Sequence, residues 1–310
     1  MKTAFLFPGQ GAQAVGMGIE IAREFPVAER IFEKANEIVG FDLRDFCFAG
    51  PAEQLNSTTV SQPAIFTVSA AILEVLRTGP SSHKITPDVT AGLSLGEYTA
   101  LYAAGLMRFE DGVRLVHKRG QAMQAAADAS EGAMVSIIGL DDETVRRLCE
   151  EAGEGELLEP VNFNCPGQIV ISGDKKACRI AKELAVKCGA IKAVRLEVAG
   201  AFHTQMMSSA AEALREALAH CEIAEPTHTQ VIANINAEYY PTSEKIKEGL
   251  VKQLTSPILW QKCMERLLAE GIEVFYEIGP GRVLTGLMRR IDRKTKVNNL
   301  SSLQAIKELL

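Results

Sequence analysis

Residues 90–100, TAGLSLGEYTA, place Ser94 between two glycines, where a β-branched apolar run ends and a helix-like run begins. Residues 92–96 match G-x-S-x-G, the nucleophile elbow, whose glycines permit a sharp strand-to-helix turn that exposes the serine hydroxyl above a sheet. The pattern also arises by chance, so the alternative is a small residue at a tight turn. The strand-like run before the turn and the helix-like run after it favour a nucleophile.

The chain around this turn has the pattern of an α/β fold. Strand-like runs at 3–7, 89–93, 230–235 and 273–278 alternate with helical patterns at 17–39, 61–77 and 245–270. This order is expected of a mostly parallel sheet. We therefore predict an α/β-hydrolase-like large domain that carries Ser94.

The middle of the chain has a different order of elements. After residue 133 a strand, a helix, two strands around the turn NCPGQ (164–168), a second helix and a last strand follow one another. Asp141 or Asp142 and then Asp174 stand where helix N-caps are expected. The β-α-β-β-α-β series predicts a ferredoxin-like insert at 128–198, and the large domain is then discontinuous, at 1–127 and 199–310.

Composition excludes several classes of protein. The 310 residues are 47% hydrophobic and 23% charged, with a net charge of −6, and no basic run with interleaved aromatics appears, so we expect no nucleic-acid partner. The apolar stretch 4–7 is too short for a signal sequence, and no segment approaches the length that spans a bilayer. We expect a soluble, cytoplasmic protein with no membrane partner.

The cysteines predict neither disulfides nor a metal. Their number, seven, is odd and they include no C-x-x-C pair, which suits neither a disulfide framework nor a zinc site. No dinucleotide-binding G-x-G-x-x-G was found either. We expect reduced thiols, no metal and no cofactor.

A serine nucleophile needs a base within hydrogen-bond reach, and the chain has five histidines. Four are most simply solvated: His83, His117, His220 and His228. His203 in VAGAFHT directly follows a predicted strand, at a turn of the kind that carries catalytic groups above a sheet. The alternative for His203 is a histidine satisfied locally in its loop.

Arg119 gives the clearest indication of substrate. On a helical wheel through 111–127 it falls in the apolar arc, beside Leu115, Val116 and Met123. A buried guanidinium keeps its charge and must meet an anion. That anion is either an Asp or Glu of another element or a ligand carboxylate held by bidentate hydrogen bonds.

An acyl-transfer site also needs amides that stabilise an oxyanion. At the elbow the amide of Leu95 points toward the same pocket as the serine. The turn at 8–11, PGQG, follows the first strand and precedes a helix, so it is the natural second supplier.

Eight motifs, in order over nearly the full length, resemble the malonyl-CoA:acyl carrier protein transacylase family and the related acyltransferase domains of polyketide synthases. They are FPGQGAQ (7–13), SQPAIFTVS (61–69), GLSLGEYTAL (92–101), KRGQAM (118–123), VNFNCPGQIVISG (161–173), GAFHT (200–204), QLTSPILW (253–260) and EIGPGRVLTGL (277–287).

The resemblance implies a role for each matching residue. Ser94 is acylated, His203 is its base and Arg119 grips the free malonyl carboxylate. Gln10 and Leu95 match the residues whose backbone amides form the oxyanion hole. The backbone carbonyl of Gln253 takes the place of the carboxylate that orients the histidine in other serine enzymes.

The resemblance also implies a set of pocket residues. Gln62, Asn162 and Asn164 match polar positions of the family's pocket, although each could equally be a turn or hairpin residue. Leu93 is a departure, because the family's usual motif is GHSLGEY, with histidine at that position. Phe202 resembles the version of the motif that accompanies malonyl selection.

The expected activity is ping-pong transfer of malonyl from malonyl-CoA to the phosphopantetheine thiol of acyl carrier protein, through an acyl-serine, for fatty-acid or polyketide synthesis. The family implies a monomer without cofactor. A serine hydrolase and a binding protein that has lost catalysis are the alternatives. An acidic carrier would dock on a basic patch, either Lys182, Lys187 and Lys192 or Arg282, Arg289 and Arg290.

Overall fold

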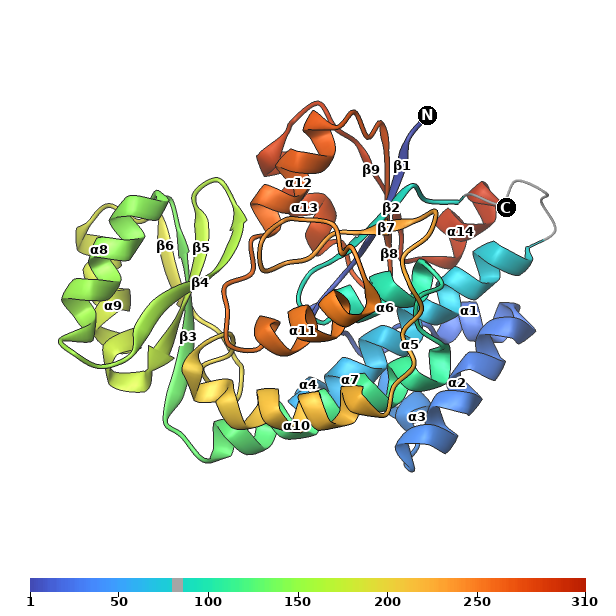
Figure 1. The fold of residues 1–310 in the computed structure, drawn as a ribbon, viewed down its shortest axis with the longest axis horizontal. Coiled ribbons are helices and arrows are strands. Elements are labelled where there is room, and N and C mark those ends of the chain that lie inside the picture. Colours follow the sequence, from blue (N-terminus) through green and yellow to red (C-terminus); the bar gives the residue numbers. More distant parts are fainter. Residues whose placement is uncertain (80–85) are drawn as a thin grey trace.

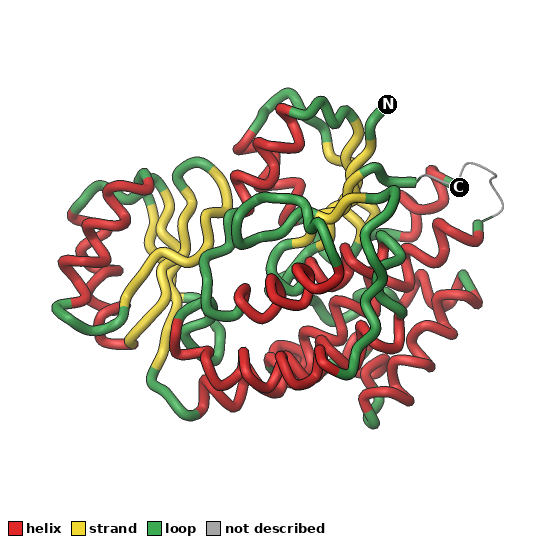
Figure 2. Tube along the Cα trace, viewed as in Figure 1, coloured by secondary structure: helices red, strands yellow, loops and turns green. Residues whose placement is uncertain are grey.

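Two sheets organise the chain, and Figures 1 and 2 show them side by side, each with its own helices. The computed structural model describes residues 1–79 and 86–310, so His83 lies outside the described residues. The larger sheet has the strand order β7-β2-β1-β8-β9, and the smaller has the order β4-β5-β3-β6.

The five-stranded sheet is parallel throughout. Its strands are β1 (Thr3–Phe7), β2 (Val89–Gly92), β7 (Gln230–Val231), β8 (Val274–Ile278) and β9 (Val297–Leu300). β1 and β2 are buried along their whole length, as expected of a parallel sheet covered on both faces. Phe7 pairs with Gly92, so the carboxyl ends of these two strands meet.

Alternate residues of β1 face two different helical layers. Ala4 and Leu6 belong to the apolar cluster that contains Trp260 and Leu284, from α12 (Trp260–Ala269) and α13 (Val283–Ile291). Phe5 and Phe7 belong to the larger cluster formed with the N-terminal helices and with α10, α11 and α14. The remaining helices of the large unit are α1 (Ile19–Glu24), α2 (Pro26–Val39), α3 (Leu43–Phe48), α4 (Ala52–Asn56), α5 (Thr58–Thr78), α6 (Gly96–Ala103), α7 (Phe109–Asp128), the short η1 (Gln205–Met207), α10 (Ser208–Ala219), α11 (Ser243–Gln253) and α14 (Leu303–Leu309).

Two segments that the sequence predicts as single helices are each divided into two helices in the structure. The pattern at 17–39 is interrupted at Phe25, which is extended and precedes Pro26 at the first position of α2. The pattern at 245–270 is interrupted by the loop 254–259, which carries Pro257. The predicted strand 230–235 is only the two residues of β7, and β9 was not predicted.

The smaller sheet has the predicted ferredoxin-like topology. β3 (Gly132–Ile138), α8 (Asp142–Gly153), β4 (Leu158–Cys165), β5 (Gln168–Asp174), α9 (Lys175–Lys187) and β6 (Lys192–Arg195) follow one another, and all sheet neighbours are antiparallel. Asp141 caps α8 by accepting from the amide of Thr144 at 2.8 Å, and Asp174 caps α9. The predicted α/β fold class with an inserted ferredoxin-like unit is therefore confirmed, and these strands lie within the predicted insert 128–198.

The α5 helix corrects the expectation that no segment has the length of a membrane span. By length and composition Thr58–Thr78 could cross a bilayer, with a mean hydropathy of 1.4 over its most apolar window. However, 78% of that window is buried inside the fold, because α5 packs against α2, α6 and α7. Its hydrophobicity therefore serves the core.

Glycines allow the turn at Ser94 to pack against the end of β1. A Cβ on Gly96 would lie 2.1 Å from the carbonyl oxygen of Phe7, and a Cβ on Gly92 would lie 1.9 Å from the carbonyl carbon of Gly96. Both distances are far shorter than real Cβ contacts, and the neighbouring atoms are backbone. The G-x-S-x-G pattern is thus a packing requirement of this turn.

We expect Gly96→Ala to lower the free energy of unfolding by about 3 kcal/mol, because the added methyl forces β1 and α6 apart. Chemical denaturation measures this change. Gly286→Ala is the matched control: a Cβ there meets nothing within 4 Å, so we expect a gain of roughly 0.5–1 kcal/mol from helix propensity. Equal stability of the two variants would contradict the close approach.

Candidate active site

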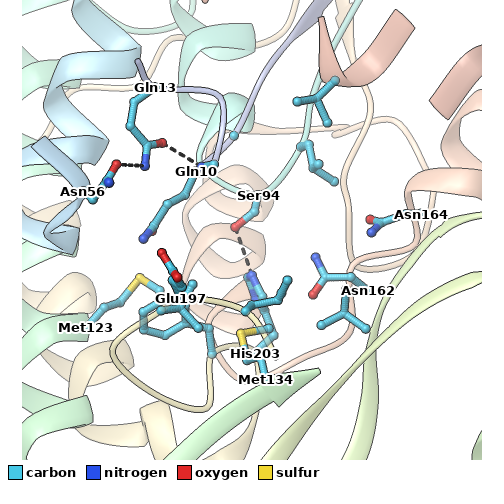
Figure 3. A pocket seen from close by; sticks show the side chains of 18 of the residues that line it. Gln10, Gln13, Asn56, Ser94, Met123, Met134, Asn162, Asn164, Glu197 and His203 are labelled. Atoms are coloured by element: carbon cyan, nitrogen blue, oxygen red, sulfur yellow. Dashed lines mark hydrogen bonds between the residues drawn. The ribbon is translucent and has the colours of Figure 1, made fainter. Parts of the chain in front are cut away.

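A cavity of about 390 Å³ lies above the carboxyl ends of β1 and β2, between the two sheets (Figure 3). Most of the residues that the sequence predicted for the site line this cavity. They are Gln10, Leu93, Ser94, Arg119, Asn162, Asn164, Phe202 and His203. The other three predicted site residues are buried behind the residues that line the cavity; they are Gln62, Leu95 and Gln253.

Ser94 occupies the strained corner of the elbow, between β2 and α6. Its φ is 51°, the left-handed region that residues other than glycine rarely adopt. The side chain of Asn234 holds the corner from both sides: its Oδ1 accepts from the Ser94 amide at 2.7 Å, and its Nδ2 donates to the carbonyl of Gly92 at 2.8 Å. The buried side-chain amide of Asn234 therefore stabilises the strained backbone conformation of Ser94.

His203 lies beside Ser94, in the loop that follows β6. Its Nε2 is 3.0 Å from the Oγ of Ser94, and its Nδ1 is 2.8 Å from the backbone carbonyl oxygen of Gln253. Because a carbonyl only accepts, Nδ1 carries the proton and Nε2 is free to accept from the serine hydroxyl. This arrangement matches a general base whose tautomer is set by a backbone group.

Burial controls the protonation of His203. The side chain is only 4% exposed, and its pKa is lowered from 6.5 to about 4. Desolvation is the largest cause, the positive charge of Arg119 also lowers this pKa, and the hydrogen bond to Gln253 acts in the opposite direction. The imidazole is therefore neutral, and able to take a proton, at neutral pH.

Arg119 extends from α7 to the floor of the cavity, where it is 1% exposed. Its Nη1 donates to Oε1 of Gln62 at 2.9 Å, and its Nη2 donates to Oε1 of Gln253 at 2.9 Å and to Oγ of Ser94 at 3.0 Å. All three acceptors are neutral. Within the residues described here, the Nε of Arg119 has no hydrogen-bond partner.

The charge of Arg119 is thus not neutralised by a hydrogen-bonded carboxylate among the described residues. Of the two anions that the sequence left open, a carboxylate from another element is not among its hydrogen-bond partners in the described part of the chain. Glu97 acts on it only through space, and the ring of Tyr98 lies 5.5 Å from the guanidinium carbon. A buried cation with neutral partners favours an anionic ligand.

The two predicted oxyanion donors come from turns that pack on each other. A Cβ on Gly9 would lie 2.3 Å from the carbonyl oxygen of Leu93, so the turn after β1 touches the elbow directly. Within the described ranges, neither the Gln10 amide nor the Leu95 amide donates a hydrogen bond to another protein group. Both amides are therefore available to a ligand oxygen.

The insert supplies the opposite wall of the cavity. Asn162 and Asn164 lie on β4, where the pairing with β5 has register shifts, and their Oδ1 atoms have no partner in the described part of the protein. Figure 3 shows both amides beside the cavity. Phe202 is 5% exposed and also lines it. Leu93, the departure from the family motif, presents an apolar side chain there.

Three buried residues of the site were missed by sequence reasoning in the roles they have here: Asn234, Glu97 and the side chain of Gln253. Burial raises the pKa of Glu97 to about 7, although it accepts hydrogen bonds from Tyr240, from Gln253 and from the Asn234 amide. Glu97 and Gln253 belong to quoted motifs, GLSLGEYTAL and QLTSPILW, and those were the only available signals. Neither Asn234 nor Tyr240 carried one.

The pKa of His203 predicts how the reactivity of Ser94 depends on pH. Only neutral His203 accepts the serine proton, and its pKa lies near 4 instead of 6.5. We expect the rate of Ser94 modification by phenylmethanesulfonyl fluoride to stay level from pH 8 down to about pH 5 and to fall as the pH drops through about 4. Intact-mass spectrometry of samples quenched at successive times measures this rate.

His203→Ala is the control, and it should react slowly at every pH. A half-maximal rate near pH 6.5 in the unmodified protein would contradict the depressed pKa and the burial that causes it.

Comparisons with known proteins agree with this geometry. Residues 4–306 match the family profile described as an acyl transferase domain. The chain is 45% identical over 306 residues to the malonyl CoA-acyl carrier protein transacylase of Bacillus subtilis (strain 168), which covers 98% of this chain and 95% of the relative. It is 43% identical over 288 residues to the protein of the same name from Escherichia coli (strain K12), covering 93% and 92%.

A solved structure described as a type II PKS acyl-carrier protein in complex with its malonyl-transacylase has the same fold. It superposes with a TM-score of 0.95 at 38% identity, over 100% of this chain and 99% of that one. Both the sequence and the architecture are thus shared over nearly the whole length. The chain belongs to the acyl transferase domain family and, within it, to the malonyl-CoA:acyl carrier protein transacylases.

Proposed function

We propose that this protein transfers the malonyl group of malonyl-CoA to the phosphopantetheine thiol of acyl carrier protein, through a malonyl ester on Ser94. The main observation behind the proposal concerns Arg119, which is buried and whose hydrogen-bond partners are all neutral. Its Nη2 lies 3.0 Å from Oγ of Ser94. This arrangement supports a substrate with an acyl carbon at Ser94 and a carboxylate close by. The names of the relatives support malonyl-CoA as the donor and carrier protein as the acceptor.

The first half of the reaction forms the ester. Oγ of Ser94 attacks the thioester carbonyl of malonyl-CoA while Nε2 of His203 takes the hydroxyl proton. The carbonyl oxygen becomes an oxyanion that the amides of Gln10 and Leu95 stabilise. When the C–S bond breaks, His203 returns the proton to the departing CoA thiolate.

Arg119 changes partners when the substrate enters. Nη2 already donates to both Gln253 and Ser94, so a bidentate grip on a carboxylate requires it to release one of them, and we propose that it releases Ser94. Gln62 and Gln253 hold the guanidinium in place from behind. The incoming carboxylate therefore frees the serine oxygen as it binds, which favours malonyl over neutral acyl groups.

The second half of the reaction uses the same groups with a thiol. The phosphopantetheine thiol gives its proton to His203 and attacks the malonyl ester. The C–O bond then breaks, and Oγ of Ser94 recovers the proton from His203. All proton transfers use protein side chains, so the proposed chemistry needs neither metal nor cofactor.

The binding site of the carrier, the oligomeric state and the location are also proposals. Arg282, Arg289 and Arg290 are exposed on or beside α13, whose Val283 and Leu287 line the cavity, which supports docking of an acidic carrier there. We propose a monomer that acts in the cytoplasm; the burial of α5 supports only that this helix belongs to the core and does not cross a membrane.

Arg119→Ala tests the selectivity. We expect kcat/KM for malonyl-CoA to fall ~100-fold, because two charge-assisted hydrogen bonds together contribute about 3 kcal/mol. We expect acetyl-CoA to become the better substrate in a panel with methylmalonyl- and succinyl-CoA. Arg114→Ala, which changes a largely exposed arginine of the same helix, is the control and should keep the wild-type ranking. An unchanged ranking in Arg119→Ala would refute its role.

Intact-mass spectrometry tests the transfer itself. Brief mixing with malonyl-CoA should leave one malonyl adduct on the wild type and none on Ser94→Ala. The adduct should persist in buffer and disappear on addition of holo carrier protein, with malonyl appearing on the carrier. An adduct that decays equally fast without carrier would identify a hydrolase instead.

A further inference from the structure

A fully buried carboxylate, that of Glu97, lies beneath the elbow and outside the cavity. The side chain is 0% exposed, and its hydrogen-bond partners in the described part of the chain are all uncharged. Burying a carboxylate without a cation is costly unless several donors compensate. The identity of those donors shows which residues this side chain holds in place.

Three donors point at the Glu97 carboxylate. Oε1 accepts from the hydroxyl of Tyr240. Oε2 accepts from the backbone N–H of Asn234 at 3.2 Å and from Nε2 of Gln253 at 2.7 Å. One oxygen therefore contacts a tyrosine, and the other joins Asn234 to Gln253.

Asn234 and Gln253 are the two residues that hold the reacting groups. Asn234 fixes the Ser94 amide and the carbonyl of Gly92, and so the strained corner of the elbow. Gln253 binds Nδ1 of His203 through its carbonyl and Nη2 of Arg119 through its Oε1. Its Nε2 also donates to the carbonyl of Ser94 at 3.1 Å.

We infer that Glu97 is a positioning residue. Its Oε2 links Asn234, which holds Ser94, to Gln253, which holds both His203 and Arg119. In this way Glu97 keeps Ser94 and His203 in register. The inference rests on the proposed function, which it deepens. The carboxylate itself touches neither substrate nor the reacting atoms.

A purely structural role for Glu97 makes a different prediction. In that case Glu97, in the first turn of α6, merely satisfies Tyr240, and removing both polar partners together should restore the protein. Replacing a buried hydrogen-bonded pair by apolar groups of similar shape is often nearly neutral for stability. The double variant Glu97→Met with Tyr240→Phe therefore separates the two roles.

For this double variant we expect a folded protein that is less stable than the wild type, because the N–H of Asn234 and Nε2 of Gln253 lose an acceptor. We expect its rate of Ser94 acylation to be about 10- to 100-fold lower, because Asn234 and Gln253 are no longer held by a common acceptor. The KM for malonyl-CoA should change less than about threefold, since Arg119 keeps Gln62 as partner. Glu97→Gln should retain the rate within about threefold, because its amide oxygen still accepts from both residues while its NH₂ donates to Tyr240. Each rate is divided by the fraction of chains whose Ser94 can be acylated, so that misfolded chains do not lower the measured rate.

The matched control is Glu74→Met with Tyr102→Phe. Glu74 also accepts from a tyrosine hydroxyl, at 2.7 Å, and it holds the other end of α6, away from the site. We expect this pair of substitutions to leave the acylation rate within about twofold of the wild type.

The rate of Ser94 modification by phenylmethanesulfonyl fluoride is measured on every variant as well. This reaction needs Ser94 and His203 but no malonyl group, so it reports their positioning even if malonyl transfer is not the activity. A double variant at 97 and 240 that is stable and reacts at the wild-type rate with both reagents would overturn the inference. So would a Glu97→Gln variant as slow as that double variant.

Discussion

The rest of this site depends on one buried positive charge. Arg119 lies in the interior with Gln62, Gln253 and Ser94 as its hydrogen-bond partners, and each of these contributes a neutral oxygen. The same charge lowers the pKa of His203 and contacts the nucleophile directly, so binding, basicity and reactivity are coupled in one group. No carboxylate of the described residues hydrogen-bonds to this cation, so a substrate carboxylate that does so gains binding energy from it.

The fold brings this charge to the serine by joining elements from distant parts of the chain. β1 and β2 end side by side, and their turns carry Ser94 and the two amides that we propose stabilise the oxyanion. α7 carries Arg119 from one side, and the loop that leads from β6 back into the large unit carries His203. Asn234, Glu97 and Gln253 link these pieces below the surface of the cavity. The site is therefore a property of the packing between units and not of a single motif.

Much of the fold and the centre of the site could be predicted from the sequence because they depend on local patterns. The elbow follows from two glycines, the position of Arg119 from a helical wheel, and the insert from the order of its elements and its aspartate caps. The breaks at Phe25 and at 254–259 were missed, because apolar periodicity continues across them although the backbone does not. Asn234 and the side chain of Gln253 could not be predicted, because their partners lie more than 100 positions away along the chain.

A crystal structure of the acyl-enzyme, trapped by flash-cooling crystals after brief exposure to malonyl-CoA, tests the role of Arg119 most directly. We predict an ester on Ser94 whose carboxylate oxygens both lie about 3 Å from Arg119, with Gln62 and Gln253 still bound to the guanidinium behind it. An ester whose carboxylate points into solvent, with Arg119 left on its protein partners, would contradict the central claim.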